Sequence, residues 1–412
     1  MNLQNAAKQT QRLTEMNTEA MRTLAYSVAD DDGHMWTVIY YIEQGRITGV
    51  LTEQQNAIHV GDIWLGRIVQ NARSIGASFA DTEGGRFFLP GIHKIGSMLP
   101  IRVETLPFRE KLAKATLKLS MKGSYTVVSC EGMGFTYSKK LDAQQKQRLQ
   151  ELAVTEAVQS IAKGGDYRIL FRTNAGEAEP EEIVKELQAL DESLAGVRKK
   201  AEEEQRCTRL YTADSVLFES VRKTVRDGGI WITASEELYR EALEVAAKLG
   251  ADASSIRFYE DMSISMSALY GMQNKLKRIL SERVWLDSGA EIVITEAEAM
   301  CVIDVNSARI QTANGKSREE VFLKLNLEAA REIRDQILAR NISGTILIDF
   351  ISMGSSESET ILLSEMKSLC RGLFPPIKVV DITKLGIMET TRQRLEGSIR
   401  EKRDLLNKTI LI

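Results

Sequence analysis

The sequence has little of the side-chain chemistry on which many sites depend. It contains four cysteines and three histidines among 412 residues. Cys130, Cys207, Cys301 and Cys370 stand singly, without a CxxC pair, which argues against a zinc finger, an iron–sulfur cluster or a disulfide framework. All three histidines lie in the first quarter of the chain, so a histidine-based metal site or catalytic triad has little support. Carboxylates are therefore the expected carriers of any catalysis.

Long apolar runs are also missing. No uncharged apolar stretch approaches the ~18 residues that a membrane span needs, and the N-terminus lacks the apolar core of a secretory signal. We therefore expect a cytoplasmic protein without a membrane span. The length suits two to four domains of about 100–200 residues each, and residues 1–20 are interpreted as a polar N-terminal extension.

The net charge of −3 argues at first against a nucleic-acid-binding protein, but the charge is unevenly distributed. Residues 60–122 carry ten basic and five acidic side chains, a balance of +5 that leaves −8 for the rest of the chain. The same segment divides into short strands separated by Gly, Pro and Asn turns, at the spacing of a small barrel. The pattern predicts a basic barrel on an acidic remainder.

The other segments show ordinary helix and strand patterns. Residues 36–51 predict a hairpin with its turn at Gln44-Gly45. The charged stretch 179–206 predicts a solvated surface helix that needs no partner. Residues 215–280 and 283–390 alternate between helix and strand, which is typical of α/β layers.

The strongest chemical signal is a pair of aspartates in apolar strands. In MCVIDVNSA, strand alternation places Asp304 and Asn306 together on the face opposite Ile303 and Val305. In GTILIDFISM, Asp349 stands between two apolar residues. Burying a carboxylate in such a strand is costly unless it is paired, hydrogen-bonded or bound to a metal.

The segment between these strands predicts a helix that makes the two strands neighbours. Ser317 and Glu320 form a capping-box pattern, and an apolar stripe follows at helical spacing: Phe322, Leu325, Ala329, Ile333 and Ile337. Strand–helix–strand predicts parallel strands about 4.8 Å apart, so two carboxylates at equal height could share one cation. Oxygen ligands without histidine favour Mg²⁺. The alternative is that each aspartate caps a turn or pairs with an arginine.

With these residues in view, the sequence resembles the ribonuclease E/G family of bacterial endoribonucleases. The resemblance is carried by TEAEAMCVIDVNSAR, NLEAAREIRDQILARNISGTILIDFISM and DITKLGIMETTRQR, and more weakly by GDIWLGRIV, FADTEGGRFFLP, GSYTVV and ILFRTNAG. It covers roughly residues 21–400.

The family implies a multidomain α+β (α/β) fold. An RNase H-like fold, in two parts, would be interrupted by an S1/OB-type barrel and a 5′-phosphate-sensor subdomain and followed by a DNase I-like catalytic subdomain. The expected bounds are 21–58 and 215–279 for the RNase H-like parts, 59–121 for the barrel, 122–214 for the sensor, 280–400 for the catalytic subdomain and 401–412 for a C-terminal tail.

The resemblance also implies roles for particular residues. Asp304 and Asp349 match the magnesium ligands, with Mn²⁺ as a substitute, and Asn306 matches a residue that hydrogen-bonds at the site. Phe79 and Phe88 match RNA-stacking aromatics of the barrel, and Lys111 matches a basic RNA contact. Because RFFLP sets two aromatics side by side, only one can face outward, so Phe88 could equally be a core residue. The 5′-monophosphate pocket would comprise Gly123, Val127, Arg172 and Thr173.

Two features depart from the family. Where it usually has a basic residue before IKVVDIT, this sequence has Pro376, with Arg371 nearby but not aligned. The two-cysteine zinc link that joins subunits is not found, so zinc is not expected and any homodimer would lack that link.

The leading hypothesis is a Mg²⁺-dependent endoribonuclease that cleaves single-stranded RNA, from messenger RNA or from ribosomal or transfer RNA precursors. The alternatives are a non-catalytic S1-type RNA-binding protein with a lapsed nuclease site and a DNA-directed phosphodiesterase.

Overall fold

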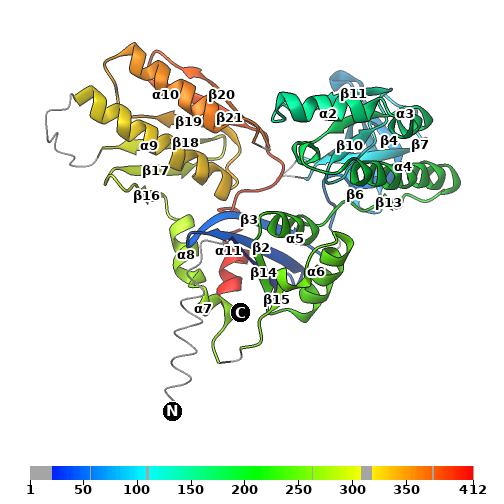
Figure 1. Cartoon of the computed structure of the whole chain (residues 1–412), viewed down its shortest axis with the longest axis horizontal. Coiled ribbons are helices and arrows are strands. Elements are labelled where there is room, and N and C mark those ends of the chain that lie inside the picture. Colours follow the sequence, from blue (N-terminus) through cyan, green and yellow to red (C-terminus); the bar gives the residue numbers. More distant parts are fainter. Residues whose placement is uncertain are drawn as a thin grey trace. The chain divides into compact units, whose positions relative to one another are not determined.

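Two compact units make up the chain in the computed structural model, and the fold is mixed α/β and multidomain (Figure 1). One unit contains residues 1–56 and 214–412, and the other consists of residues 57–213. The structure describes residues 21–55, 57–107, 111–261, 263–307, 318–373 and 375–411. The expected extension 1–20 and Ser317 of the expected capping box lie outside these described residues.

The first sheet of the larger unit combines strands from both sides of the inserted unit. Its order is β15 (Ile256–Phe258), β14 (Ile230–Thr233), β1 (Arg22–Ala29), β2 (Met35–Glu43) and β3 (Arg46–Gln54). The predicted hairpin is confirmed as β2–β3. Its turn residues Gln44 and Gly45 have φ of 48° and 73°, as two-residue turns that follow the strand twist require.

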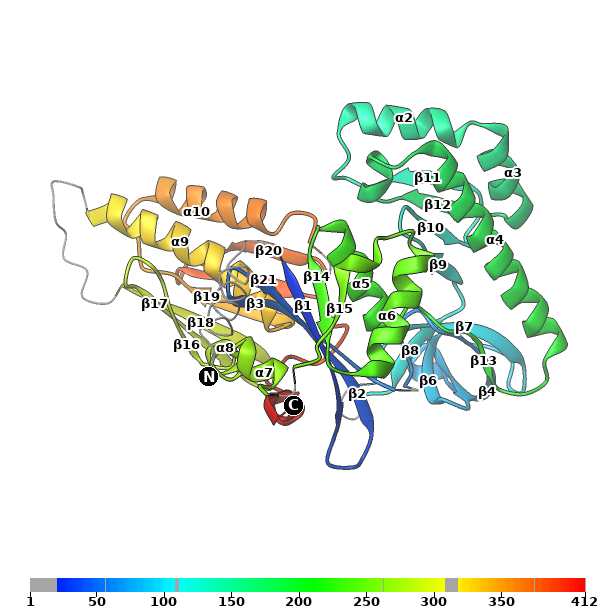
Figure 2. The same cartoon turned by 60° about the horizontal axis from the view of Figure 1, so that its bottom comes forward.

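Helices cover both faces of this first sheet (Figure 2). α5 (Val216–Arg226) and α6 (Glu236–Lys248) pack on the face that carries Trp231. The opposite face packs against α7 (Met266–Leu269), α8 (Met272–Ile279) and α11 (Arg403–Lys408). Short 3₁₀ turns are η3 (Ala253–Ser255) and η4 (Thr409–Leu411).

The C-terminal segment is part of this core, which corrects the expectation of a tail at 401–412. Leu406 of α11 is fully buried in the cluster that includes Tyr40. The Tyr40 hydroxyl lies 2.9 Å from that of Thr409, which is also fully buried. The segment packs there because its apolar residues help to cover the face of the first sheet that also packs against α7 and α8.

The second sheet of the larger unit has six strands and helices on one face. Its order is β16 (Arg283–Trp285), β17 (Glu291–Glu296), β18 (Met300–Asn306), β19 (Gly344–Asp349), β21 (Ile387–Arg392) and β20 (Ile377–Ile382). α9 (Arg318–Ala339) and α10 (Ser356–Leu369) lie against one face of it (Figure 1). The apolar residues of both helices are buried in the core on this face. The other face keeps Val302 and Val380 exposed.

The inserted unit contains the predicted barrel. Its strands are β4 (Ile63–Ala72), β5 (Ala77–Thr82), β6 (Gly85–Pro90), β7 (Met98–Thr105) and β8 (Ala113–Thr116). They pair in the order β4-β5-β6-β8-β7, and β7 pairs back with β4 to close the barrel. The turn η1 (Arg73–Ile75) joins β4 to β5. The short strand β13 (Arg209–Tyr211) pairs with β4 in the antiparallel direction.

A four-stranded sheet with three helices completes the inserted unit. Its order is β11 (Gly134–Tyr137), β12 (Arg168–Phe171), β10 (Thr126–Ser129) and β9 (Ser120–Lys122). The other elements are α2 (Ala143–Ala153), α3 (Glu156–Gly165), η2 (Thr173–Gly176) and α4 (Pro180–Glu203).

The charged helix α4 has partners, contrary to the expectation of a solvated surface helix. Ile183, Leu187, Leu194 and Val197 of this helix are buried in the core of the inserted unit. Its charged residues hide an apolar stripe at helical spacing. Among the described residues, no helix combines the length and apolarity needed to cross a membrane.

The four free cysteines fall into two groups, which predicts their reactivity. Cys301 and Cys370 are buried, and burial raises the pKa of their thiols to about 12 and about 11. Cys130 and Cys207 are half-buried. The thiolate is the reactive form of cysteine. We therefore expect a thiol-modifying reagent at pH 8 to react with Cys130 and Cys207 of the folded chain before Cys301 and Cys370, as measured by thiol titration with mass mapping. Full denaturation should release all four, whereas equal rates in the folded chain would contradict the prediction.

Candidate functional site

The two aspartates lie side by side at the ends of neighbouring parallel strands. β18 and β19 pair in parallel, and the last pair of their ladder is Asp304 with Asp349. This confirms the prediction of adjacent parallel strands joined through a helix. Both residues stand at the carboxyl ends of their strands, which is the edge where open α/β sheets place ligands.

Neither carboxylate is buried, and this corrects the argument from burial cost. Ile303, Val305 and Ile348 point into the core beneath α9 and α10, whereas Asp304 is half-buried and Asp349 is exposed. Strand alternation produces this division because the helices cover only one face of the sheet. The aspartates are thus at the surface, where a ligand can reach them.

Asn306 orients one of the two carboxylates. It lies two residues beyond Asp304 on the same face of β18, as predicted, and its side-chain Nδ2 donates to Asp304 Oδ2 at 2.7 Å. Because this bond holds Oδ2, it also fixes the direction in which the other carboxylate oxygen of Asp304 points. A side-chain amide can hold an ionised carboxylate in place in this way without neutralising it.

Asn326, which the sequence reasoning missed, fixes the chain just after Asp349. It is fully buried in α9, where its Nδ2 donates to the carbonyl oxygen of Ile351 at 2.8 Å and its Oδ1 accepts from the Ile351 N–H at 3.0 Å. The signal that could have found it is its place beside Leu325 on the buried side of the helix, because a buried amide needs partners.

A second clamp holds the same loop a few residues later. The Glu319 carboxylate accepts from the backbone N–H groups of Gly354 at 2.9 Å and Ser355 at 3.1 Å. The donation from Gly354, together with the Ser358 hydroxyl, lowers the pKa of Glu319. The loop that follows Asp349 is therefore anchored to α9 at two points.

On the barrel, the structure decides which aromatic faces outward. Phe87 is fully buried in the barrel core, while Phe88 is half-buried on the outer surface. Phe88 is the cross-strand partner of Phe79, which is also half-buried on the outside. The two rings pack edge to face, with their centroids 6.2 Å apart. The two predicted stacking residues thus form one aromatic pair on the barrel surface.

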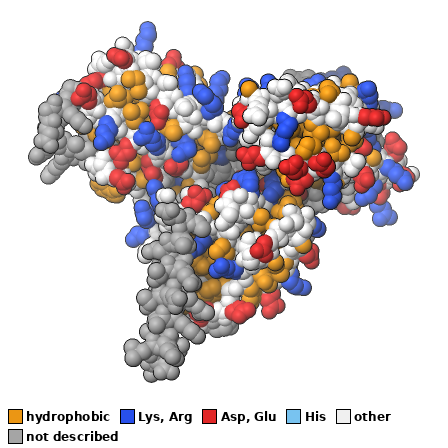
Figure 3. All heavy atoms as spheres, in the orientation of Figure 1, with side chains coloured by type: hydrophobic (Ala, Val, Ile, Leu, Met, Phe, Trp, Pro, Cys, Tyr) orange, Lys and Arg blue, Asp and Glu red, His pale blue; other side chains and the backbone are white. Residues whose placement is uncertain are grey.

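Basic side chains border this aromatic pair. Lys114, which the sequence reasoning missed, is the register partner of Phe88 on β8, and the predicted contact Lys111 is exposed three residues earlier. Lys114 forms an ion pair with Glu104 at 2.8 Å, and Arg86 with Asp81 at 2.7 Å. Basic and acidic side chains are likewise mixed over the visible surface (Figure 3).

Two of the four predicted pocket residues meet at one turn. Arg172 Nη1 donates to the carbonyl oxygens of Gly123 and Ser124, so Gly123 and Arg172 lie together. Val127 is half-buried in β10, four residues beyond Gly123, and exposed Thr173 lies with its hydroxyl 2.9 Å from that of Ser138. The same turn is bonded from its other side by Glu186 of α4, a contact that the sequence reasoning missed.

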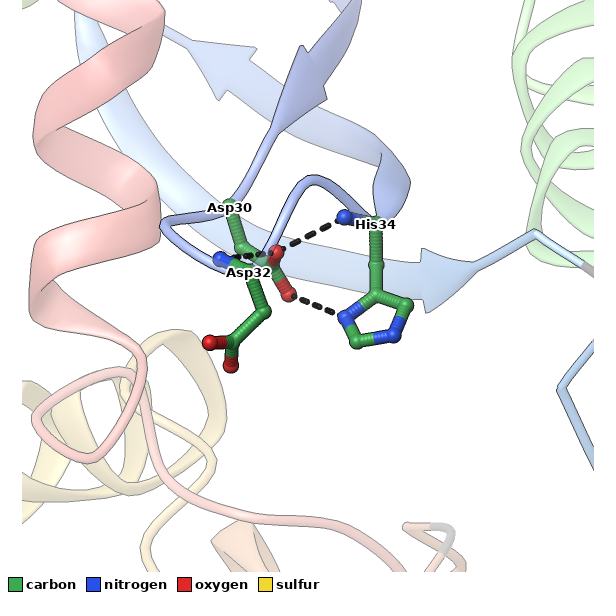
Figure 4. A group of neighbouring side chains, drawn as sticks. All are labelled: Asp30, Asp32 and His34. Atoms are coloured by element: carbon green, nitrogen blue, oxygen red, sulfur yellow. Dashed lines mark hydrogen bonds and ion pairs between the residues drawn. The ribbon is translucent and has the colours of Figure 1, made fainter.

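A separate cluster of two aspartates and one histidine lies in the β1–β2 turn (Figure 4). The atoms of Asp30, Asp32 and His34 that could bind a metal lie within 4.8 Å of one another. The Asp30 carboxylate already accepts from the backbone N–H groups of Asp32 and His34 and from the Trp36 indole at 2.9 Å. The Trp36 bond contributes most to lowering the pKa of Asp30 to about 2. This group is explained by its role in closing the turn.

Comparison with known proteins shows to which family the chain belongs. The Ribonuclease E/G family model matches residues 120–395, which include both aspartates, and the chain belongs to that family. A chloroplastic ribonuclease E/G-like protein of Arabidopsis thaliana is 27% identical over 300 residues, 68% of this chain and 28% of that protein. Ribonuclease E of Synechocystis is 27% identical over 406 residues, 89% of this chain and 56% of that protein. Ribonuclease E of Escherichia coli K12 is 26% identical over 321 residues, 77% of this chain and 30% of that protein.

The chain thus spans only about a quarter to somewhat over half of the length of these relatives.

The clamp by Asn326 makes a prediction about stability. In Asn326→Leu a side chain of similar size can neither accept from the Ile351 N–H nor donate to the Ile351 carbonyl oxygen. We expect the free energy of unfolding to fall by about 1–3 kcal/mol, measured by urea denaturation. Lys324→Gln, at an exposed position of the same helix, serves as the control and should change stability by less than about 0.5 kcal/mol. Equal stability of the two variants would contradict the clamp.

Proposed function

We propose that this protein is a Mg²⁺-dependent endoribonuclease that cleaves single-stranded RNA to products with 5′-phosphate and 3′-hydroxyl ends. The observation that carries the proposal is the in-register pair Asp304 and Asp349 on an exposed sheet edge, in a chain that belongs to the ribonuclease E/G family. The relatives that carry the name ribonuclease E support an RNA substrate.

The donor set at this edge fits a magnesium ion. Asp304 and Asp349 offer carboxylate oxygens from backbones about 4.8 Å apart, and Mg²⁺ is commonly held by one or two carboxylates while it keeps several waters. Asp349 is exposed and Asp304 is half-buried, which leaves room for those waters and for a phosphodiester. When bound, the ion supplies positive charge that activates water and stabilises the charge developing on the phosphate.

The chain's own residues supply orientation at this edge. Asn306 fixes the direction of the Asp304 carboxylate, and the Asn326 and Glu319 clamps fix the loop after Asp349. The two carboxylates are thus held in place before a substrate arrives. Such preorganisation lowers the cost of reaching the reactive geometry.

The barrel supplies a surface suited to single-stranded RNA. Phe79 and Phe88 offer ring surfaces on which bases can stack, and stacking accepts every base. Lys114 and Arg86 lie near the rings, each paired with a carboxylate, and residues 60–122, which include Lys111, carry an excess of basic side chains. Binding should therefore weaken as salt is added. The proposal assigns affinity to this surface and cleavage to the aspartates.

Removing either aspartate charge should abolish cleavage. We expect purified Asp304→Asn and Asp349→Asn proteins to bind a fluorescent single-stranded RNA normally but to cleave it more than about a hundredfold more slowly. Changing even a residue that only contacts a metal ligand costs about 10–100-fold, and this smaller loss is expected for Asn306→Ala. Cleavage rates across Mg²⁺ and Mn²⁺ concentrations measure the effect.

The matched control is Asp381→Asn, an exposed aspartate on the edge strand β20 of the same sheet, which should cleave like the wild type. Full Mg²⁺-dependent cleavage by Asp304→Asn or Asp349→Asn would show that the site assignment is wrong. A wild-type protein that binds RNA without cleaving it would instead favour the non-catalytic RNA-binding alternative. Competition with a DNA oligonucleotide of equal length tests the DNA-directed alternative.

Loss of one outer aromatic should weaken RNA binding without unfolding the barrel. Phe88→Ala removes a stacking surface, and we expect binding to weaken by about 1–3 kcal/mol, measured by fluorescence anisotropy. Ile75→Ala, which removes an exposed apolar side chain elsewhere on the barrel, is the control and should bind like the wild type. Unchanged binding by a folded Phe88→Ala protein would exclude this surface as the RNA contact.

A further inference from the structure

The second sheet carries an exposed tryptophan on its edge strand β16 (Figure 1). All four tryptophans of the chain lie in the described residues, and of these only Trp285 is exposed, at 66% of its surface. An exposed apolar side chain by itself needs no explanation. The position of Trp285 relative to the candidate site is what gives it a role.

Trp285 lies in one row with a residue of the candidate site. It is opposite Glu291 of β17 in the register of the sheet, and Glu291 is opposite Asn306 of β18. All three stand on the open face, because their neighbours in sequence belong to the core on the covered face: Val284, Leu286, Ile292 and Val305. Asn306 donates to Asp304, so the row leads directly to the aspartate pair.

The spacing of strands sets the distance between the tryptophan and the aspartate edge. Two steps between neighbouring strands, each about 4.8 Å, place the backbones of Trp285 and Asn306 about 10 Å apart. Stacked nucleotides of one strand rise about 3.4 Å each. An RNA strand that crosses the two aspartates therefore brings a base to Trp285 within about three nucleotides of the phosphate at the metal.

The charges around the ring favour a base over the phosphate backbone at this point. The Glu291 carboxylate accepts from Arg283 Nη1 at 2.6 Å, so the guanidinium beside Trp285 is already paired. Together with Asp304 and Asp349, these side chains leave the edge with excess negative charge, which repels a phosphate that lies away from the metal. The indole ring is uncharged, and an aromatic ring stacks with every base.

We propose that Trp285 is a nucleobase-stacking subsite of the aspartate edge, which takes a base of single-stranded RNA close to the scissile phosphate. The inference rests on the proposed function, because it is the strand crossing Asp304 and Asp349 that reaches the ring. It assigns to the second sheet a base contact of its own, in addition to the aromatic pair Phe79 and Phe88 of the inserted unit.

The test combines variants of the full chain with RNAs that each lack one base. Binding is measured by fluorescence anisotropy in EDTA, where metal-dependent cleavage does not occur. At one position we expect the missing base to weaken binding to the wild type about tenfold, but binding to Trp285→Ala less than about twofold, because the base and the ring act as a pair. With intact RNA, Trp285→Ala should bind about tenfold more weakly, and Trp285→Phe should restore most of the loss.

The matched control is Ile361→Ala, which removes an exposed apolar side chain of α10, on the covered side of the same sheet. It should bind RNA like the wild type and keep the sensitivity to the missing base. Phe88→Ala should keep that sensitivity as well, because the barrel stacks a different base. Stacking should also quench the tryptophan fluorescence of the wild type, and this quenching should be lost in Trp285→Phe. Circular dichroism checks the fold of each variant.

The outcomes separate this inference from the proposed nuclease function. Equal sensitivity of the wild type and Trp285→Ala to every missing base would overturn the inference. So would dissociation of a wild-type oligomer by Trp285→Ala without any change in RNA binding, since a second copy would then cover the ring. If Trp285→Ala does not fold, the fluorescence quenching decides in the same way. A wild type that shows the coupling but cleaves no RNA keeps the subsite and loses the nuclease function, whereas one that cleaves RNA without the coupling loses only the subsite.

Discussion

The in-register pairing of two parallel strands, β18 and β19, is the constraint on which the candidate site depends. Side chains alternate between the faces of a strand, so a slip of one residue would turn Asp349 toward the core and separate it from Asp304. The slip is opposed by the apolar residues of both strands, which α9 and α10 cover from one side only. Packing of the covered face thereby determines the chemistry of the open face.

Carboxylates accept hydrogen bonds from the backbone N–H groups of turns at several places in the molecule. Asp30 closes the β1–β2 turn, Glu319 holds the loop after Asp349, and Glu186 fills the β9–β10 turn. Asp62 is fully buried and accepts from two backbone N–H groups in the barrel unit. Part of the acidic excess of the chain is therefore used to satisfy backbone donors, which are costly to leave unpaired.

Much of the fold could be predicted because short-range patterns reflect burial directly. The apolar stripe of α9 is buried at Ala329, Ile333 and Ile337, and the barrel strands close as their spacing indicates. What could not be predicted depends on distant packing. Alternation alone does not show that α11 completes the first sheet, or that the open side of the second sheet leaves the aspartates exposed.

The sequence by itself determined the family and the parallel pair of strands, because these lie in continuous motifs with their own periodicity. It also indicated that Asp304, Asn306 and Asp349 lie together on one face. Only the tertiary structure decided which phenylalanine faces outward and that Glu186 fills the turn at Gly123. Two adjacent residues of the same type cannot be told apart from the sequence until packing of the core buries one of them. A contact between residues 60 positions apart exists only once the elements have packed.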